Sequence, residues 1–392
     1  MTAQGPLSGV TVVDLSRVLA GPFCTLVLAD LGARVIKVEA PGGGDDSRHF
    51  GPFVGGKSAY FMSLNRGKES IALDLKAEED RAVLHSLLDR ADVLVENFRP
   101  GTMDRLGFGW GSLQKRHPRL IYAAVSGFGQ TGPYSPRAAY DIIVQAMGGV
   151  MSLTGYPDGS PARVGTSLGD IAAALFLAVG VSAALYHRAL TGSGMMIDVA
   201  MLDGQVAILE NAIARYTTTG SVPGPLGARH PSITPFDVFG AADGHLVIAA
   251  GNDLLFQRLC AALDRADLAE NPLFRTNDLR TLHHAALKDE LESVLRLRPI
   301  GHWLRAFEHA GVPSGPINSI DKVLADPQVV YRNMVVSTND PVAGPVALAG
   351  NPIKLSAFPD PSSRPPAPEL DGDRERILRM LAEDPAPEQS EA

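Results

Sequence analysis

The sequence predicts an α/β protein built around a parallel β-sheet. Short apolar runs typical of buried strands alternate with helical segments along the first half of the chain. The pattern opens with a βαβ unit, in which strands over Val10–Leu15 and Arg34–Glu39 flank a helix over Phe23–Leu31. A chain of 392 residues is too long for one ordinary core, so two domains are expected.

The larger domain is expected to be Rossmann-like, to span residues 1–215, and to be completed by a C-terminal segment over 325–380. Its further predicted elements are strands over Ser70–Leu75, Val93–Glu96 and Leu120–Ser126, and helices over Glu78–Arg90 and Ile171–Tyr186. Strands that alternate with helices in this way predict a parallel sheet with helices on its faces.

A smaller α+β domain is expected over residues 225–324, after a stretch rich in Gly, Pro and Ser that is typical of a linker. Its predicted elements are a hairpin of Phe236–Phe239 with His245–Ala250, helices over Leu254–Leu263, Leu282–Leu297 and Ile300–Ala310, and an irregular segment over Val312–Val323. Residues 381–392 are expected to be disordered.

Composition excludes several classes of protein. The formal net charge is −8, so there is no basic excess of the kind that nucleic-acid-binding proteins carry. The two cysteines, Cys24 and Cys260, lie far apart without metal-type spacing, which fits a reducing cytoplasm. The most apolar run, Ile171–Tyr186, falls short of the roughly 20 residues that span a bilayer, so no membrane association is expected.

Asp170 is the first candidate for chemistry. It ends the segment Gly165-Thr166-Ser167-Leu168-Gly169-Asp170, directly before the apolar helical run. An Asp at a helix entrance is a good helix opener, and the helix dipole and free N–H groups favour its ionised form. A positioned carboxylate can serve as a covalent nucleophile. The alternative is a capping Asp without a chemical role.

A second polar motif, Asn97-Phe98-Arg99-Pro100-Gly101, follows the strand over Val93–Glu96. It therefore stands at the carboxyl edge of the sheet, where open α/β sheets bind ligands, and arginines there suit phosphates. A nicotinamide site is not expected, although Glu39 stands where an acid would hold a ribose. Only one glycine, Gly21, follows the first strand, and the GxGxxG fingerprint is missing.

Taken together, these segments resemble family III coenzyme A transferases, the group that includes formyl-CoA and carnitine CoA-transferases. The resemblance covers roughly residues 5–360, and its order and spacing are specific. The matching segments are Leu7–Ser16, Ala20–Pro22, Leu31–Glu39, Val95–Gly101, Gly127–Tyr134, Tyr140-Asp141 and Gly169-Asp170.

The resemblance implies a role for each candidate site residue. Asp170 would be the catalytic nucleophile, and Tyr60 and Tyr140 would line the acyl pocket. Arg229 or His230 would bind the distal carboxylate of a dicarboxylate substrate such as succinyl-CoA. The residues implied in coenzyme A binding are Leu19, Ala20, Leu73, Lys76, Asn97, Phe98, Arg105 and Arg137.

Some positions depart from the family pattern. Arg137 is offset by one from the expected basic residue, and Ala40 stands where some relatives carry an arginine. The glycine-rich lid loop of formyl-CoA transferases is missing, which argues against formyl or oxalyl substrates. The related α-methylacyl-CoA racemases use a histidine in the segment where this chain has Tyr140. A racemase needs two bases, so the transferase is favoured over the racemase.

The resemblance also implies the partners and the reaction. An acyl-CoA donor and a carboxylic acid acceptor would exchange coenzyme A through an aspartyl anhydride and an aspartyl-CoA thioester on Asp170, without a metal or a permanently bound cofactor. The family forms interlocked homodimers, so a homodimer is expected. A non-enzymatic alternative is a protein that binds coenzyme A and in which Asp170 only caps a helix.

Overall fold

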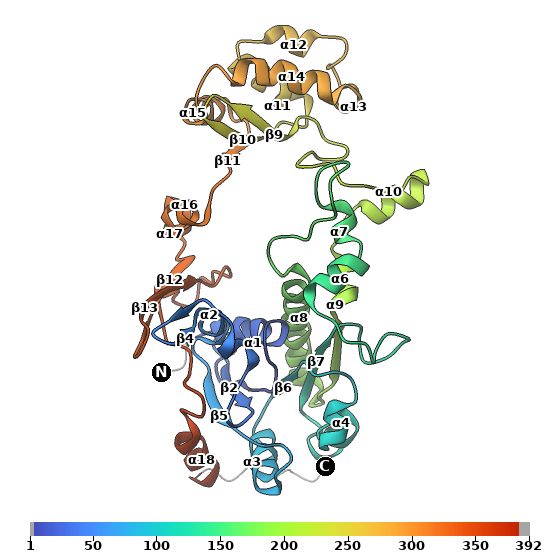
Figure 1. The fold of residues 1–392 in the computed structure, drawn as a ribbon. Helices are drawn as coiled ribbons and strands as arrows, with labels where there is room; N and C mark the ends of the chain where they lie inside the picture. The colour runs from blue at the N-terminus through green and yellow to red at the C-terminus, as the bar shows by residue number, and fades with distance from the viewer. Residues whose placement is uncertain (1–3, 384–392) are drawn as a thin grey trace. The chain divides into compact units, whose positions relative to one another are not determined.

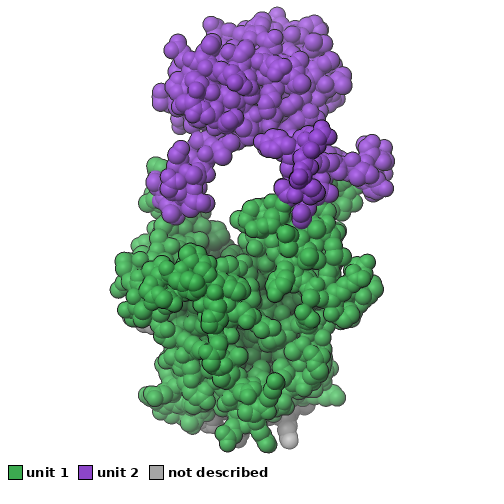
Figure 2. Space-filling view, in the orientation of Figure 1, with its two compact units in different colours: residues 1–150, 163–214, 327–392 green, residues 151–162, 215–326 purple. Residues whose placement is uncertain are grey.

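The computed structural model describes residues 4–383, which form two compact units (Figures 1 and 2). Unit 1 comprises the chain up to Val150, Arg163–Ala214 and the chain from Pro327 onward; unit 2 comprises Met151–Ala162 and Arg215–Asp326. Of the tail predicted to be disordered, residues 381–383 belong instead to helix α18 (Arg374–Glu383), and residues 384–392 lie outside the described part.

A six-stranded sheet forms the centre of unit 1, with the strand order β5-β2-β1-β6-β7-β8 and every neighbouring pair parallel. The predicted parallel sheet is therefore confirmed. Its strands are β1 (Thr11–Asp14), β2 (Arg34–Glu39), β5 (Glu69–Ala72), β6 (Val93–Glu96), β7 (Ile121–Ser126) and β8 (Met196–Ala200). The chain order reverses between β1 and β6, and such a switch point opens a crevice at the carboxyl ends of the strands.

Helices cover both faces of this sheet because successive strand residues point to opposite sides. Val12 packs on the face of α1 (Ala20–Asp30) and α8 (Leu168–Thr191), whereas its neighbour Val13 packs on the face of α3 (Glu78–Leu88). The C-terminal helix α18 lies beside α3 (Figure 1), and its Ile377 is fully buried there. The chain end thus completes the core of unit 1.

The remaining elements of unit 1 are short. A three-stranded sheet has the order β13-β12-β14, with β12 antiparallel to β13 and parallel to β14. The strands of this sheet are β12 (Val335–Asp340), β13 (Gly344–Ala349) and β14 (Ser363–Arg364). A separate two-stranded sheet pairs β3 (Phe53–Val54) with β4 (Lys57–Ser58). The helices are η1 (Asp46–His49), α2 (Ala59–Asn65), α4 (Thr102–Leu106), α5 (Trp110–Arg116), α6 (Asp141–Met147), α9 (Met201–Ala207) and α17 (Pro327–Tyr331). Helices α7 (Val150–Leu153) and α10 (Ala212–Thr219) lead from unit 1 into unit 2.

Helix α8 is longer than the run predicted for it. It has 24 residues instead of about 16, and by length and composition it could cross a bilayer. Within its most apolar window 44% of the residues are buried, and the helix packs against α1 and α9, as the core helix of a globular domain does. The apolar pattern underestimated the length of this helix, because polar residues in its first and last turns interrupt the apolar run.

Unit 2 has a core of its own around the predicted hairpin, which is present. Strands β9 (Phe236–Ala241) and β10 (Gly244–Ala249) pair antiparallel, and β11 (Ser314–Pro316) joins β10 on its other side. The helices are α11 (Asp253–Ala262), α12 (Ala266–Glu270), α13 (Asn277–Leu282), α14 (His284–Leu295), α15 (Ile300–Ala310) and α16 (Ile320–Ala325).

Two predictions for unit 2 are wrong in detail. The helix expected over Leu282–Leu297 is interrupted at His283, where α13 ends and α14 begins. The return segment expected to be irregular contributes β11 and α16, and β11 adds a third strand to the hairpin. A strand of three residues, Ser-Gly-Pro, is too short to show a strand pattern in the sequence, and its pairing with β10 depends on the tertiary structure.

Candidate active site

A cavity of about 220 Å³ lies at the switch point of the large sheet in unit 1. The loop after β1 and the loop after β6 form two of its walls, as expected where the strand order reverses. The structure brings seven of the predicted site residues together in its lining: Leu19, Ala20, Asn97, Phe98, Arg137, Tyr140 and Asp170.

Asp170 is the third residue of α8, and its half-buried side chain lines this cavity. In the described part of the chain its carboxylate accepts no hydrogen bond. Burial, and then the negative charge of Asp141, raise the pKa of Asp170 to about 7. The direction of this shift is opposite to the one expected from the helix dipole, because desolvation of the carboxylate outweighs the attraction of the helix end.

Asp141 performs the capping that was considered for Asp170. Asp141 is 8% exposed and stands in the first turn of α6. Its Oδ1 accepts the N–H of Gly169 at 2.7 Å, within the first turn of α8. The Nε2 of Gln145 donates to both oxygens of the same carboxylate, at 3.0 and 2.8 Å. The alternative in which Asp170 only caps a helix loses its basis, since another carboxylate occupies that position.

Gly169 allows the close approach of α6 and α8. A Cβ atom at this position would lie 2.6 Å from Cγ2 of Val144 and 3.0 Å from Oδ1 of Asp141. Neither distance leaves room for a side chain, so a glycine directly before Asp170 is required by packing.

Asn97 holds the loop after β1. Its Oδ1 accepts the N–H of Arg17 at 2.9 Å, and its Nδ2 donates to the carbonyl of Arg17 at 2.7 Å. Phe98 follows, and the guanidinium of Arg17 lies 5.4 Å from the centre of its ring. Contacts of Asn97 and Phe98 with coenzyme A remain a prediction.

A second cavity of about 220 Å³ adjoins the first, since Phe98 lines both. Leu73 and Lys76 line the second cavity together with Ala40. Two cavities that meet at one aromatic ring can accommodate the two parts of an elongated ligand. Arg105 lies apart from both linings, exposed on α4, where it donates to Oγ1 of Thr102 at 2.9 Å.

Tyr60 is half-buried on α2, outside the lining of the first cavity. Burial, and then the negative charge of Asp170, raise the pKa of Tyr60 to about 12, so Tyr60 lies within electrostatic range of the Asp170 carboxylate. Arg229 and His230 belong to unit 2, where the His230 ring lies 5.4 Å from that of Phe236. Their proposed role in binding a carboxylate stays a prediction.

Two acidic residues at strand ends, Glu39 and Glu96, are buried in the structure, which was not expected from the sequence. Glu39, considered for a ribose, is 4% exposed and is held by Arg48 at 2.7 Å and by the hydroxyl of Ser70 at 2.6 Å. Glu96 ends β6, is 3% exposed, and has its pKa raised to about 7, chiefly by burial. The sequence does contain a signal for such residues, namely an acidic residue within an apolar strand run. A buried charge needs a partner, so such a residue predicts a buried ion pair or hydrogen bond.

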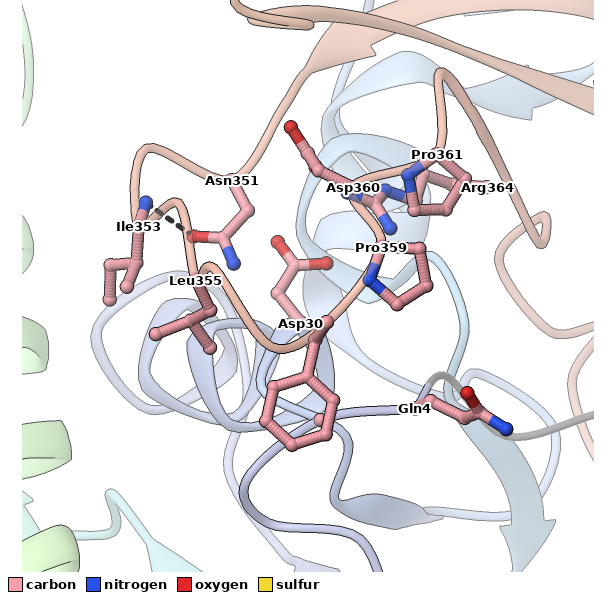
Figure 3. A pocket seen from close by; sticks show the side chains of 11 residues that line it. Gln4, Asp30, Asn351, Ile353, Leu355, Pro359, Asp360, Pro361 and Arg364 are labelled. Carbon is pink, nitrogen blue, oxygen red and sulfur yellow. Dashed lines mark hydrogen bonds and ion pairs between the residues drawn. The ribbon is translucent and has the colours of Figure 1, made fainter.

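Another cavity is lined by the N-terminal segment and the chain around Asn351–Arg364 (Figure 3). It measures about 70 Å³ and contains none of the predicted site residues in its described lining. The side chains of Asp30 and Asn351 point into it (Figure 3). Within residues 4–383 there is no cluster of three or more His, Cys, Asp or Glu side chains that could hold a metal ion.

Residues 7–374 match the model of CoA-transferase family III. The chain belongs to this family. It is therefore an enzyme that transfers coenzyme A, and the predicted family and enzyme class are confirmed. The matched residues span nearly the whole chain and include the lining of both cavities.

Individual relatives agree with this assignment. An acetyl-CoA:oxalate CoA-transferase of Acetobacter aceti is 50% identical over 369 residues, which cover 94% of each chain. A succinyl-CoA:glutarate CoA-transferase of Mus musculus is 41% identical over 377 residues, covering 96% of this chain and 86% of the relative. The crystal structure of a CAIB/BAIF family protein from Brucella suis matches with a TM-score of 0.85 at 39% identity, covering 96% of this chain and 99% of that one.

Proposed function

We propose that the protein transfers coenzyme A from a donor acyl-CoA to an acceptor carboxylic acid, with Asp170 as the covalent nucleophile. The free carboxylate of Asp170 supports this proposal: it lines the cavity at the switch point while Asp141 caps the helix. A carboxylate that is desolvated and without hydrogen bonds is a stronger nucleophile than one in water. With a pKa of about 7, a substantial fraction of Asp170 is ionised at neutral pH.

The reaction takes place in four acyl transfers. Asp170 attacks the thioester carbonyl of the donor, which gives a mixed anhydride and releases the coenzyme A thiolate. The thiolate attacks the aspartyl carbonyl, so that an aspartyl-CoA thioester forms and the donor acid leaves as a carboxylate. The acceptor carboxylate attacks this thioester, and the released thiolate then attacks the acceptor carbonyl of the second anhydride. Asp170 is regenerated, and no proton or electron is left unbalanced.

The two cavities would divide the donor between them. The thioester end would lie beside Asp170, with Leu19, Ala20, Asn97, Tyr140 and Arg137 around it, and Tyr60 nearby. The adenosine end would extend past Phe98 toward Leu73 and Lys76, with Arg105 available to the phosphates. Binding energy from this long tail can hold the thioester against the nucleophile, which a weak nucleophile needs.

Small dicarboxylates are the proposed acceptors, and acetyl-CoA or succinyl-CoA the proposed donors. Arg17, Arg99 and Arg137 line the cavity of Asp170, and three guanidinium groups favour an anionic substrate. Two of the relatives are named for oxalate and for glutarate as acceptors. Oxalyl substrates were not expected, because the glycine-rich lid loop is missing. The relative that is named for oxalate is nevertheless 50% identical to this chain, so oxalate is the first acid to test. Arg229 or His230 would bind a distal carboxylate.

A homodimer, interlocked as the family resemblance implies, is proposed as the working form in the cytoplasm. Helix α8 exposes large apolar side chains at a spacing that places them on one stripe: Leu175, Phe176, Val179, Tyr186 and Leu190. Val179 is 67% and Leu190 69% exposed in the single chain. A second copy that covers this stripe would remove the cost of its exposure to water. Light scattering of the purified protein measures the mass directly.

Trapping of the covalent intermediate tests the proposed function. The wild-type protein is incubated with acetyl-CoA and with succinyl-CoA, and the mass of the peptide that carries Asp170 is measured before and after hydroxylamine. We expect an adduct that hydroxylamine removes, and no adduct or transfer in Asp170→Ala. Asp203→Ala is the matched control, because Asp203 is the exposed third residue of the neighbouring helix α9 and lies outside the cavity lining.

Two outcomes of this experiment would count against the proposal. Transfer that survives in Asp170→Ala at more than a few per cent would move the nucleophile elsewhere. Exchange of deuterium into the α-carbon of an acyl-CoA without transfer to an acid would indicate a racemase instead. The racemase is not favoured, since Tyr140 occupies the segment in which those enzymes carry a histidine.

A further inference from the structure

The loop between β1 and α1 contains a residue in an unfavourable backbone conformation. Val18 has a φ of 68°, in the left-handed region that a β-branched residue rarely adopts. Val18, Leu19 and Ala20 all line the cavity of Asp170, so the strained residue belongs to a wall of the proposed active site. Such a conformation persists only where surrounding groups impose it.

The N–H of Val18 is held by Asp45. The N–H of Val18 points at the Asp45 carboxylate, 3.0 Å from Oδ1 and 3.3 Å from Oδ2. Asp45 is 2% exposed, and the backbone N–H and the hydroxyl of Ser47 donate to its Oδ1 at 2.8 and 2.7 Å. Ser47 thus holds in place the same carboxylate oxygen that accepts the N–H of Val18.

Lys37 links Asp45 to the residue that precedes Arg17 in the chain. Its Nζ lies 2.8 Å from Oδ2 of Asp45, and both side chains are 1% exposed. The same ammonium donates to the carbonyl of Ser16 at 2.7 Å. One buried ion pair therefore holds the carbonyl before Arg17 and the N–H after it, while Asn97 holds the N–H and carbonyl of Arg17 itself.

We propose that Asp45 is a positioning residue for coenzyme A transfer, which holds Val18 in the left-handed conformation and thereby fixes the wall of the cavity that faces Asp170. A change of Val18 to a relaxed, negative φ would either turn its N–H away from Asp45 or change the direction of the chain into α1. Leu19 and Ala20 would move with it, and in the described structure their own N–H groups have no acceptor. The substrate readout below rests on the proposed function.

The test asks whether a glycine at position 18, which adopts a positive φ without strain, makes the Asp45 carboxylate dispensable. Asp45→Asn keeps the size of the side chain but removes the charge that Lys37 pairs with and the second acceptor oxygen. Val18→Gly removes the backbone strain, because glycine adopts positive φ freely. Val18→Ala also shortens the side chain but keeps the Cβ and is the matched control. Each is made alone and in combination with Asp45→Asn.

Two measurements are made on all variants. Hydrogen exchange of the peptide containing residues 15–20 reports on the loop in the absence of any ligand. Calorimetric titration with free coenzyme A gives the Kd. We expect Asp45→Asn to speed exchange in the loop and to raise the Kd about tenfold, which corresponds to about 1.4 kcal/mol. Val18→Gly should restore most of the affinity of Asp45→Asn, and Val18→Ala should not.

The outcomes separate the two proposals. Unchanged loop exchange in Asp45→Asn, or equal recovery by the glycine and alanine variants, overturns the positioning role. A wild-type protein that binds no coenzyme A contradicts the proposed function, whereas the ligand-free exchange still tests the contact between Asp45 and Val18. If Asp45→Asn does not fold, Ser47→Ala takes its place, since it keeps the ion pair and removes one hydrogen bond that orients the carboxylate.

Discussion

Replacement of Asp141 by Asn should shift the pH dependence of transfer to lower pH. The pKa of Asp170 rises from 3.8 to about 7, and burial contributes more to this rise than the charge of Asp141 does. The charge of Asp141 therefore accounts for less than half of roughly three pH units, and we expect the acid limb of the profile to move down by about one unit. The sign follows from the chemistry, because Asp170 must be ionised to attack.

The assay is the pH profile of kcat/KM for transfer from acetyl-CoA to oxalate between pH 5 and 9. Asn at position 141 can still accept the N–H of Gly169, so α8 keeps its cap while the charge is lost. Asp203→Asn is the control for a lost carboxylate on a neighbouring helix. An acid limb that stays in place in Asp141→Asn, with the protein folded, would refute the assignment of the limb to Asp170 or of its high pKa to Asp141.

Three further predictions follow from the described contacts. Asp170→Asn should stabilise the protein by up to about 4 kcal/mol at pH 8 and not at pH 3.5, because a raised carboxyl pKa costs stability as the pH rises from 3.8 to about 7; urea unfolding at both pH values tests this. Gly169→Ala should abolish transfer and lower the stability by about 1–3 kcal/mol, since its Cβ would meet Val144, whereas Gly165→Ala, with open space around it, should leave the melting temperature unchanged. Arg280→Met should destabilise the protein by about 3 kcal/mol in urea unfolding, because this fully buried guanidinium holds the carbonyls of three chain segments; an unchanged midpoint would contradict that role.

Much of the sheet could be predicted from local pattern alone. The predicted strands over Arg34–Glu39 and Val93–Glu96 have the observed bounds, because each is a short apolar run between polar or glycine-containing turns. Helix α15 over Ile300–Ala310 is likewise predicted to the residue, and Gly311 ends it in the left-handed conformation. The longest helix was underestimated, since the first and last turns of α8 contain polar residues that no longer match an apolar pattern.

The candidate site was only partly accessible from sequence. Asp170, Asn97 and Phe98 follow strands or open a helix, so their place at the sheet edge could be inferred from the order of the elements. The roles of Asp45 and Asp141 could not, because each acts on a backbone N–H that is distant in sequence, on Val18 and Gly169 respectively. Such pairings depend on how two segments approach each other, and a single sequence carries no record of that.

The sequence by itself determined the class of the protein: alternating strands and helices, an acid before an apolar helix, and polar residues at strand ends. These are local properties, set by the side chains of a few consecutive residues. The tertiary structure decided which carboxylate caps and which stays free, because burial and the charge of Asp141 act through space. It also decided the chemistry available to Asp170, since the pKa of a carboxyl group depends on the water and charges around it and not on its neighbours in the chain.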